Sequence, residues 1–202
     1  MLIKASAITN LTDARYFAAK EVTFLGFNLE AGTPGYLDPM YMKAIREWVQ
    51  GPKVTGEFDR TPAAVVREAA SFYGLDAVQV TRTDDLALLE GLEVILYVPA
   101  KPDVSAIRAI FQEASPAVGY FLLDFSPIAG AESGLLENAG AWRELFAAFP
   151  TLLQLDVPAD ALNGLLEALQ PAGLAVRGGE EEMVGVKSFE EIDAVFETLG
   201  IV

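Results

Sequence analysis

Residues 2–13, LIKASAITNLTD, decide how the rest of the chain is interpreted. The apolar residues that open this stretch favour a strand, Asn10 interrupts it, and Thr12 with Asp13 favours the start of a helix. Strand, polar turn and helix form the first half of a βα unit. On a strand of period two, Lys4 and Ser6 face the same side, near the carboxyl end where α/β proteins usually build their sites.

Length and composition predict one globular domain over residues 1–202. The chain is 52% hydrophobic and 21% charged, which is enough for one well-buried core. No apolar run reaches the ~18 residues of a membrane span, and the first residues do not form a signal-peptide pattern. We therefore expect a cytoplasmic protein without a membrane partner.

The chain has no cysteine and no histidine. Their absence excludes disulfides, Cys nucleophiles, His bases and the commonest zinc ligands, so we expect neither a metal site nor a cofactor. The formal charge is −15 without a basic cluster. Nucleic acid is therefore not an expected partner, because binding it requires many Lys and Arg side chains.

Apolar runs and helical patterns alternate along the whole chain. Strands are predicted near residues 2–8, 22–28, 53–58, 76–80, 92–98, 118–125, 151–155 and 174–176. Helices are predicted near residues 11–20, 38–50, 61–74, 83–89, 103–114, 141–149, 159–169 and from 188 onward, and residues 126–134 are predicted to form a loop. Strict alternation of eight units predicts a parallel sheet closed into a (β/α)8 barrel, the TIM barrel. An open doubly wound sheet is rejected, because ITNLTD lacks the Gly-rich turn of that fold.

Several residues predict where helices begin, end and pack. Asp38–Pro39 and Thr61–Pro62 are typical of an N-cap followed by the first helical residue, and Gly74 is typical of a C-cap. Ser188 is predicted to open the last helix, with Glu190 and Glu191 at its positive end. Trp48 and Trp142 are predicted to pack between helices and barrel.

Seven fragments, in the same order and spacing, resemble the phosphoribosylanthranilate isomerase family of tryptophan biosynthesis. The family's K-x-C-G-I-T-N is similar to residues 4–10, G-F to 26–27, S-x-R-Y-[IV]-x-P to 33–39, K-V-G-V-F to 53–58, V-Q-L-H-G to 78–82, L-L-D to 122–124, and D-V-S-S-G-V-E-x-x-P-G-x-K-D to 175–180 and 184–188. The resemblance implies a TIM barrel and an Amadori rearrangement, in which a ribosylamine ring opens and an aldose-type sugar becomes a ketose.

The resemblance also implies roles for residues at the barrel mouth. Asp124 matches the acid that protonates the ring oxygen, and Ser6 stands where the family has its Cys base. A Ser hydroxyl needs an adjacent base, for which the candidates are Lys4, if burial lowers its pKa, and Glu57. Lys4 is expected to pair with a carboxylate such as Asp124 or Asp156.

The predicted substrate site differs from the family pattern at several positions. The family's loop Arg falls on Gly35, its His on Thr81, and its phosphate-binding Gly-Gly on residues 155–156, Leu-Asp. An aspartate repels a phosphate by about 1 kcal/mol or more at a distance of several Å. The remaining predicted substrate and phosphate ligands are Arg177, Gly178, Gly179 and Gln79.

Two functions remain open from the sequence. The first is isomerisation of a phosphorylated sugar ligand by Asp124, Ser6 and Lys4. The second is a catalytically inactive or repurposed barrel that binds another small molecule or a protein, with a mouth filled by side chains such as Tyr36, Glu57 and Arg82. Whether the chain is an active enzyme, and whether it is a monomer or a homodimer, is not decided by these patterns.

Overall fold

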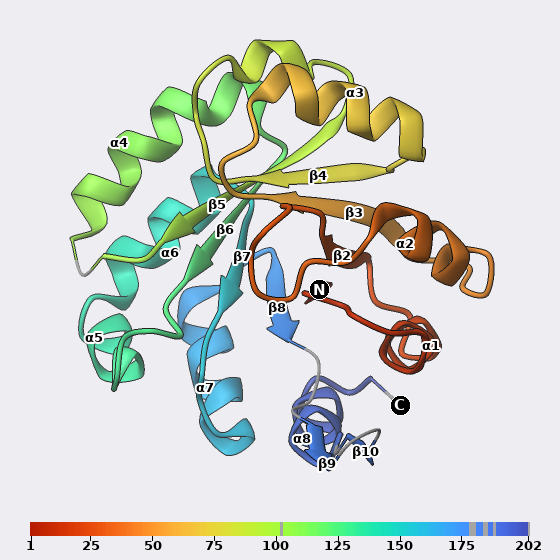
Figure 1. The fold of residues 1–202 in the computed structure, drawn as a ribbon. Helices are drawn as coiled ribbons and strands as arrows, with labels where there is room; N and C mark the ends of the chain where they lie inside the picture. Colours follow the sequence, from red (N-terminus) through yellow and green to blue (C-terminus); the bar gives the residue numbers. More distant parts are fainter. Residues whose placement is uncertain (102, 178–180, 184–185, 188, 202) are drawn as a thin grey trace.

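The computed structural model describes residues 1–101, 103–177, 181–183, 186–187 and 189–201. Eight parallel strands form a closed barrel in which sequence neighbours pair with one another (Figure 1). The strands are β1 (Leu2–Ser6), β2 (Phe24–Asn28), β3 (Lys53–Phe58), β4 (Ala77–Val80), β5 (Glu93–Pro99), β6 (Tyr120–Asp124), β7 (Thr151–Gln154) and β8 (Gly173–Arg177). The barrel closes where β8 pairs with β1, with Ser6 opposite Arg177. The predicted (β/α)8 fold is confirmed.

Helices surround this barrel and cover its outer surface (Figure 1). The α-helices are α1 (Leu11–Ala19), α2 (Pro39–Arg46), α3 (Ala63–Tyr73), α4 (Val104–Ala114), α5 (Ala131–Glu137), α6 (Ala139–Ala148), α7 (Ala159–Leu169) and α8 (Glu190–Thr198), and the short 3-10 helices are η1 (Leu86–Leu89) and η2 (Ser115–Ala117). No helix of the described residues is long and apolar enough to cross a membrane.

Three connections differ from the prediction. Residues 83–89 form only η1 instead of an α-helix, because Asp85 takes a left-handed backbone conformation with φ 57° and aspartates favour turns over helix interiors. The predicted loop 126–134 contains the start of α5, which buries Leu135 in the core. The antiparallel pair β9 (Glu181–Met183) and β10 (Val186–Lys187) was not predicted.

The helix ends agree with the prediction at some positions only. The Asp38 carboxylate accepts a hydrogen bond from the Met40 N–H at 2.8 Å, and Gly74 ends α3 with φ 65°. The prediction that Thr61 is an N-cap is wrong, because α3 begins at Ala63 and no side chain caps it. Ser188 lies outside the described residues, whereas the predicted acids do occupy the first turn of α8.

The core has two parts, separated by the strands. Side chains that point into the barrel form one part, with Phe24, Ala77, Ile95, Leu122, Leu152 and Ala175. Side chains between strands and helices form the other, in which Trp142 is 2% exposed as predicted. The prediction that Trp48 packs against the barrel is wrong, because its side chain is 65% exposed. It lies beyond the end of α2, whose apolar residues Met42 and Ile45 fill the core instead.

Candidate active site

The predicted site residues meet at the barrel mouth, which is the end of the barrel where the eight strands finish. Lys4 and Ser6 come from β1, Gln79 from β4, Asp124 from β6 and Arg177 from β8. Since inward and outward side chains alternate along a strand, the two β1 residues both face the interior, as their spacing predicted. Gly178 and Gly179 lie outside the described residues.

Lys4 forms a buried ion pair with Glu57 of β3 rather than with Asp124 or Asp156. Its side chain is fully buried, and its Nζ also donates a hydrogen bond to the Oγ of Ser6 at 2.7 Å. Burial lowers the pKa of Lys4, although the Glu57 carboxylate opposes this effect. The nearby charge of Arg177 lowers the pKa of Lys4 further.

Gly26 of β2 leaves the space that this ion pair occupies. A Cβ on Gly26 would overlap Oε1 of Glu57 and lie 2.7 Å from the Nζ of Lys4. The second carboxylate oxygen of Glu57 accepts the Ala7 N–H at 3.2 Å, where Ala7 has a left-handed backbone with φ 54°. This conformation is uncommon for a residue other than glycine, and the hydrogen bond to Glu57 helps to hold Ala7 in it.

Asp124 is 1% exposed and is surrounded by donors. Its Oδ1 accepts hydrogen bonds from the backbone N–H and the hydroxyl of Ser126, at 2.9 and 2.5 Å. Its Oδ2 accepts the Tyr97 hydroxyl at 2.7 Å and lies 3.6 Å from the guanidinium of Arg177. These contacts give both oxygens of the buried carboxylate a hydrogen-bond partner. Burial, together with the bond to Asp124, raises the pKa of Tyr97 to about 12.

Sequence reasoning did not identify Tyr97 and Ser126 as partners of Asp124. Two signals could have found them. Tyr97 is two residues from Ile95 on β5, so both face the barrel interior. Ser126 stands two residues after Asp124, the spacing at which an Asp side chain accepts a local hydrogen bond in a turn.

Arg177 and Gln79 leave part of their polar groups available for a ligand. The Arg177 side chain is 62% exposed, and its single close carboxylate is Asp124 among the described residues. The Oε1 of Gln79 is buried and has no hydrogen-bond partner in the part of the chain that the structure describes. A buried acceptor without a partner favours the binding of a ligand or water that donates a hydrogen bond to it.

The side of the mouth next to β7 and β8 carries acids. Asp156 follows β7, and Glu190, Glu191 and Asp193 lie in the first turn of α8. TIM barrels frequently bind phosphate at the loops after these two strands. Of these acids, Asp193 pairs with Lys20 at 3.3 Å and accepts the Tyr16 hydroxyl at 2.7 Å, while Arg177 places a cation at the end of β8.

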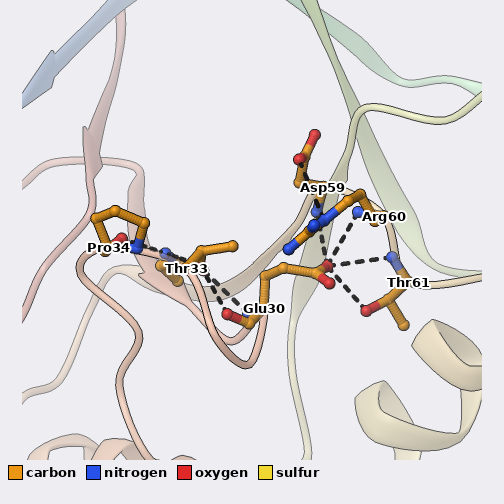
Figure 2. Close-up of polar contacts among 7 residues, drawn as sticks. Glu30, Thr33, Pro34, Asp59, Arg60 and Thr61 are labelled. Carbon is orange, nitrogen blue, oxygen red and sulfur yellow. Dashed lines mark hydrogen bonds and ion pairs between the residues drawn. The ribbon is translucent and has the colours of Figure 1, made fainter.

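Another buried carboxylate joins two loops at the mouth. Figure 2 shows Glu30, which follows β2, reaching to the loop after β3. Its Oε2 accepts the backbone N–H groups of Asp59, Arg60 and Thr61 at 3.0, 3.0 and 3.1 Å, and the Thr61 hydroxyl at 2.8 Å. Burial raises the pKa of Glu30, but the four hydrogen bonds outweigh it, so the pKa lies below its ordinary value. This contact explains why Thr61 does not cap α3.

No group of three or more Asp, Glu, His or Cys side chains is arranged to hold a metal ion within the described ranges.

Comparisons with known proteins agree with the fold and with the motifs. No family model matches the chain. The N-(5'-phosphoribosyl)anthranilate isomerase of Maridesulfovibrio salexigens is 25% identical over 205 residues, covering 99% of this chain and 98% of the relative. The enzyme of the same name from Gloeothece citriformis is 27% identical over 213 residues, covering 98% of this chain and 94% of the relative.

A solved structure extends the comparison to the fold. It is a phosphoribosyl anthranilate isomerase in complex with reduced 1-(o-carboxyphenylamino)-1-deoxyribulose 5-phosphate, with a TM-score of 0.76 and 20% identity over the whole of both chains. In sequence and in fold, the chain is a divergent relative of the phosphoribosylanthranilate isomerases.

Proposed function

We propose that the chain is an isomerase of the phosphoribosylanthranilate isomerase type, in which the pair of Lys4 and Ser6 replaces a thiol base. The contact that carries this proposal is the 2.7 Å hydrogen bond between the Nζ of Lys4 and the Oγ of Ser6. Ser6 ends the strand that resembles the family's base-bearing motif, and Asp124 ends the strand that resembles the motif with the acid.

Asp124 is assigned the first proton transfer. In an Amadori rearrangement, an acid donates a proton to the ring oxygen as the bond from that oxygen to C1 breaks. The amine nitrogen supplies the electron pair that forms a C=N bond. Ser126, Tyr97 and Arg177 surround this carboxylate and hold it in one orientation at the end of β6.

Lys4 and Ser6 are assigned the second transfer. A base removes the C2 proton, and the freed electron pair forms a C1=C2 bond while the electron pair of the C=N bond returns to the nitrogen. The resulting enol-amine becomes the ketone by gaining a proton at C1 and losing the proton of its C2 hydroxyl. The Ser6 oxygen accepts this proton while its own hydroxyl proton passes to the free amine of Lys4. The lowered pKa of Lys4 increases the fraction of free amine, whereas Glu57 decreases it.

A phosphorylated sugar is the ligand that this proposal requires. The solved relative described above is bound to such a molecule, a carboxyphenylamino deoxyribulose 5-phosphate. In this chain Arg177 would contact its phosphate and Gln79 Oε1 would accept a hydrogen bond from one of its hydroxyls. The acids near β7 and α8 would weaken phosphate binding relative to a site lined by backbone N–H groups.

Binding without turnover is the second candidate function. The buried ion pair of Lys4 and Glu57 favours it, because an ammonium held by a carboxylate is a poor base. In that case the polar residues at the barrel mouth bind a ligand without removing its C2 proton.

A direct assay with purified protein and phosphoribosylanthranilate separates the two functions. Turnover that is lost in Asp124→Asn supports the isomerase, and Ser6→Cys should raise kcat at least about tenfold by restoring an intrinsically better base. Ser133→Cys on the exposed face of α5 is the matched control for adding a thiol to a cysteine-free chain. If the wild-type protein and Ser6→Cys both bind the substrate analogue saturably but neither turns over the substrate, the first function is refuted and the second is supported. Neither binding nor turnover would overturn both.

A further inference from the structure

An aspartate in the loop after β3 faces the barrel mouth without being buried in it. Inward and outward side chains alternate along β3, and Glu57 is the last inward residue of the strand. Asp59 is the next residue with the same orientation. Its side chain is 58% exposed, and its ion pair with the neighbouring Arg60 is long, at 3.9 Å. Exposed pairs of this kind contribute little, so the Asp59 carboxylate stays accessible to a ligand.

The strand register places Asp59 on the side of the mouth where the assigned acid lies. Through β4, Glu57 of β3 stands level with Ile95 of β5. Two residues further along, Asp59 therefore stands level with Tyr97. Burial and the contact with Asp124 raise the pKa of Tyr97, and the charge of Asp59 adds to this rise, which agrees with the placement. Because the Tyr97 hydroxyl donates to Asp124 at 2.7 Å, Asp59 lies near the group that is assigned the first proton transfer.

Glu30 holds the backbone of Asp59 in place. The Oε2 of Glu30 accepts the backbone N–H groups of residues 59, 60 and 61 and the Thr61 hydroxyl. Figure 2 shows the Asp59 carboxylate pointing away from this contact. Hydrogen bonds to a charged acceptor are stronger than neutral ones, so the loop is ordered before a ligand arrives. A group that stabilises a short-lived charge requires such preorganisation.

We propose that Asp59 contacts the substrate and stabilises the positive charge that forms on its nitrogen when the ring opens. This inference rests on the proposed isomerase function. In that reaction Asp124 protonates the ring oxygen, the bond from this oxygen to C1 breaks, and the nitrogen on C1 supplies the electron pair of the new C=N bond. The nitrogen stays positively charged until C2 loses its proton and the electron pair returns.

The bonding of the substrate determines where this charge forms. The ring oxygen and the nitrogen are both attached to C1, so the charged nitrogen is one carbon away from the atom that Asp124 protonates. Asp59 lies on the same side of the mouth, and it neither gives nor takes a proton in this step. A carboxylate that meets a charge present only after ring opening accelerates the chemical step rather than substrate binding.

Asp59→Asn tests this role, and Asp84→Asn is the matched control. Asp84 lies in the next loop of the mouth, is 68% exposed and likewise pairs with an arginine, Arg82. With phosphoribosylanthranilate as substrate, Asp59→Asn should lower kcat at least about tenfold and leave KM within about twofold, because the substrate nitrogen is uncharged before ring opening. Asp84→Asn should leave both constants unchanged.

A binding measurement separates the contact of Asp59 from turnover. The probe is 1-amino-1-deoxyribitol 5-phosphate, whose protonated amine stands on the carbon that carries the substrate nitrogen. Ribitol 5-phosphate is its counterpart without the amine. Calorimetry should show that Asp59→Asn weakens binding of the amine at least about tenfold while binding of ribitol 5-phosphate is unchanged. Circular dichroism and the unfolding midpoint establish that the variants fold.

The results distinguish failure of this role from failure of the isomerase. If the wild type and Asp59→Asn turn over the substrate equally well, the role of Asp59 is overturned and the isomerase stands. If the wild type has no turnover but Asp59→Asn selectively weakens binding of the amine, the isomerase falls and the contact of Asp59 with a cationic ligand stands. An equal effect of Asp84→Asn, or no binding of the amine by the wild type, would overturn the inference.

Discussion

Replacing Glu57 by Gln should make folding depend on the protonation of Lys4. In the wild-type protein Lys4 is fully buried, and Glu57 is its ion-pair partner. Glu57→Gln keeps an oxygen for the Ala7 N–H but leaves the ammonium without a counter-charge. Removing one partner of a buried pair typically costs about 3–5 kcal/mol.

The cost has an upper limit, because Lys4 can lose its proton instead of remaining charged. Folding with a neutral lysine costs about 1.4 kcal/mol for each pH unit below its ordinary pKa of about 10.4, hence roughly 4–5 kcal/mol at pH 7 and about 2 at pH 9. The folded variant then binds fewer protons than the unfolded chain, so its stability rises with pH. A typical domain has about 5–15 kcal/mol of stability in total, so the loss is large.

Urea unfolding at pH 7, 8 and 9 measures this effect. The matched control is Glu93→Gln, which breaks the more exposed ion pair between Lys53 and Glu93 and should cost at most about 1 kcal/mol without a pH slope. The double variant Lys4→Met, Glu57→Gln should regain most of the lost stability, because no buried charge remains. The reasoning is refuted if Glu57→Gln costs less than about 1 kcal/mol, or if its deficit relative to wild type does not shrink with rising pH.

Further predictions concern neighbouring residues. Gly26→Ala should destabilise the folded protein by several kcal/mol, because the added Cβ overlaps the buried ion pair. Gly140→Ala is the control, since nothing lies within 4 Å of the added carbon and its stability should not fall. Thermal unfolding of both variants measures the difference. Glu30→Gln should cost about 1–3 kcal/mol at pH 7 by weakening hydrogen bonds to a charged acceptor. Because the folded pKa of Glu30 lies below its unfolded value of about 4.3, its contribution is complete above that value and is lost as the pH falls through the folded pKa. Urea curves of wild type and variant should therefore converge in acid, and a gap that persists there would contradict this explanation. Tyr97→Phe removes a donor that orients Asp124, so turnover of phosphoribosylanthranilate should fall; unchanged turnover would exclude a positioning role for Tyr97.

The fold was largely predictable because its signals are local. Strand and helix periods of 2 and 3.6 residues are properties of short stretches, and eight alternating units have few ways to bury their apolar faces. The errors fell where local signals are weak or contradict packing. Residues 126–134 are rich in glycine and alanine, yet part of them is helical because Leu135 is buried. Thr61 has the chemistry of a helix cap, yet its hydroxyl binds Glu30 instead.

The sequence alone determined that Lys4, Ser6 and Asp124 lie at one end of the barrel, because parity along a strand and the direction of parallel strands decide this. Only the tertiary structure decided their partners. Asp124, Asp156 and Glu57 are all carboxylates near strand ends, and Lys4 binds the one that is 53 residues away, across a glycine that leaves room for the contact. Which acid pairs with a buried cation depends on the order of the strands and on the side-chain volumes around the barrel. No single stretch of the sequence contains that information.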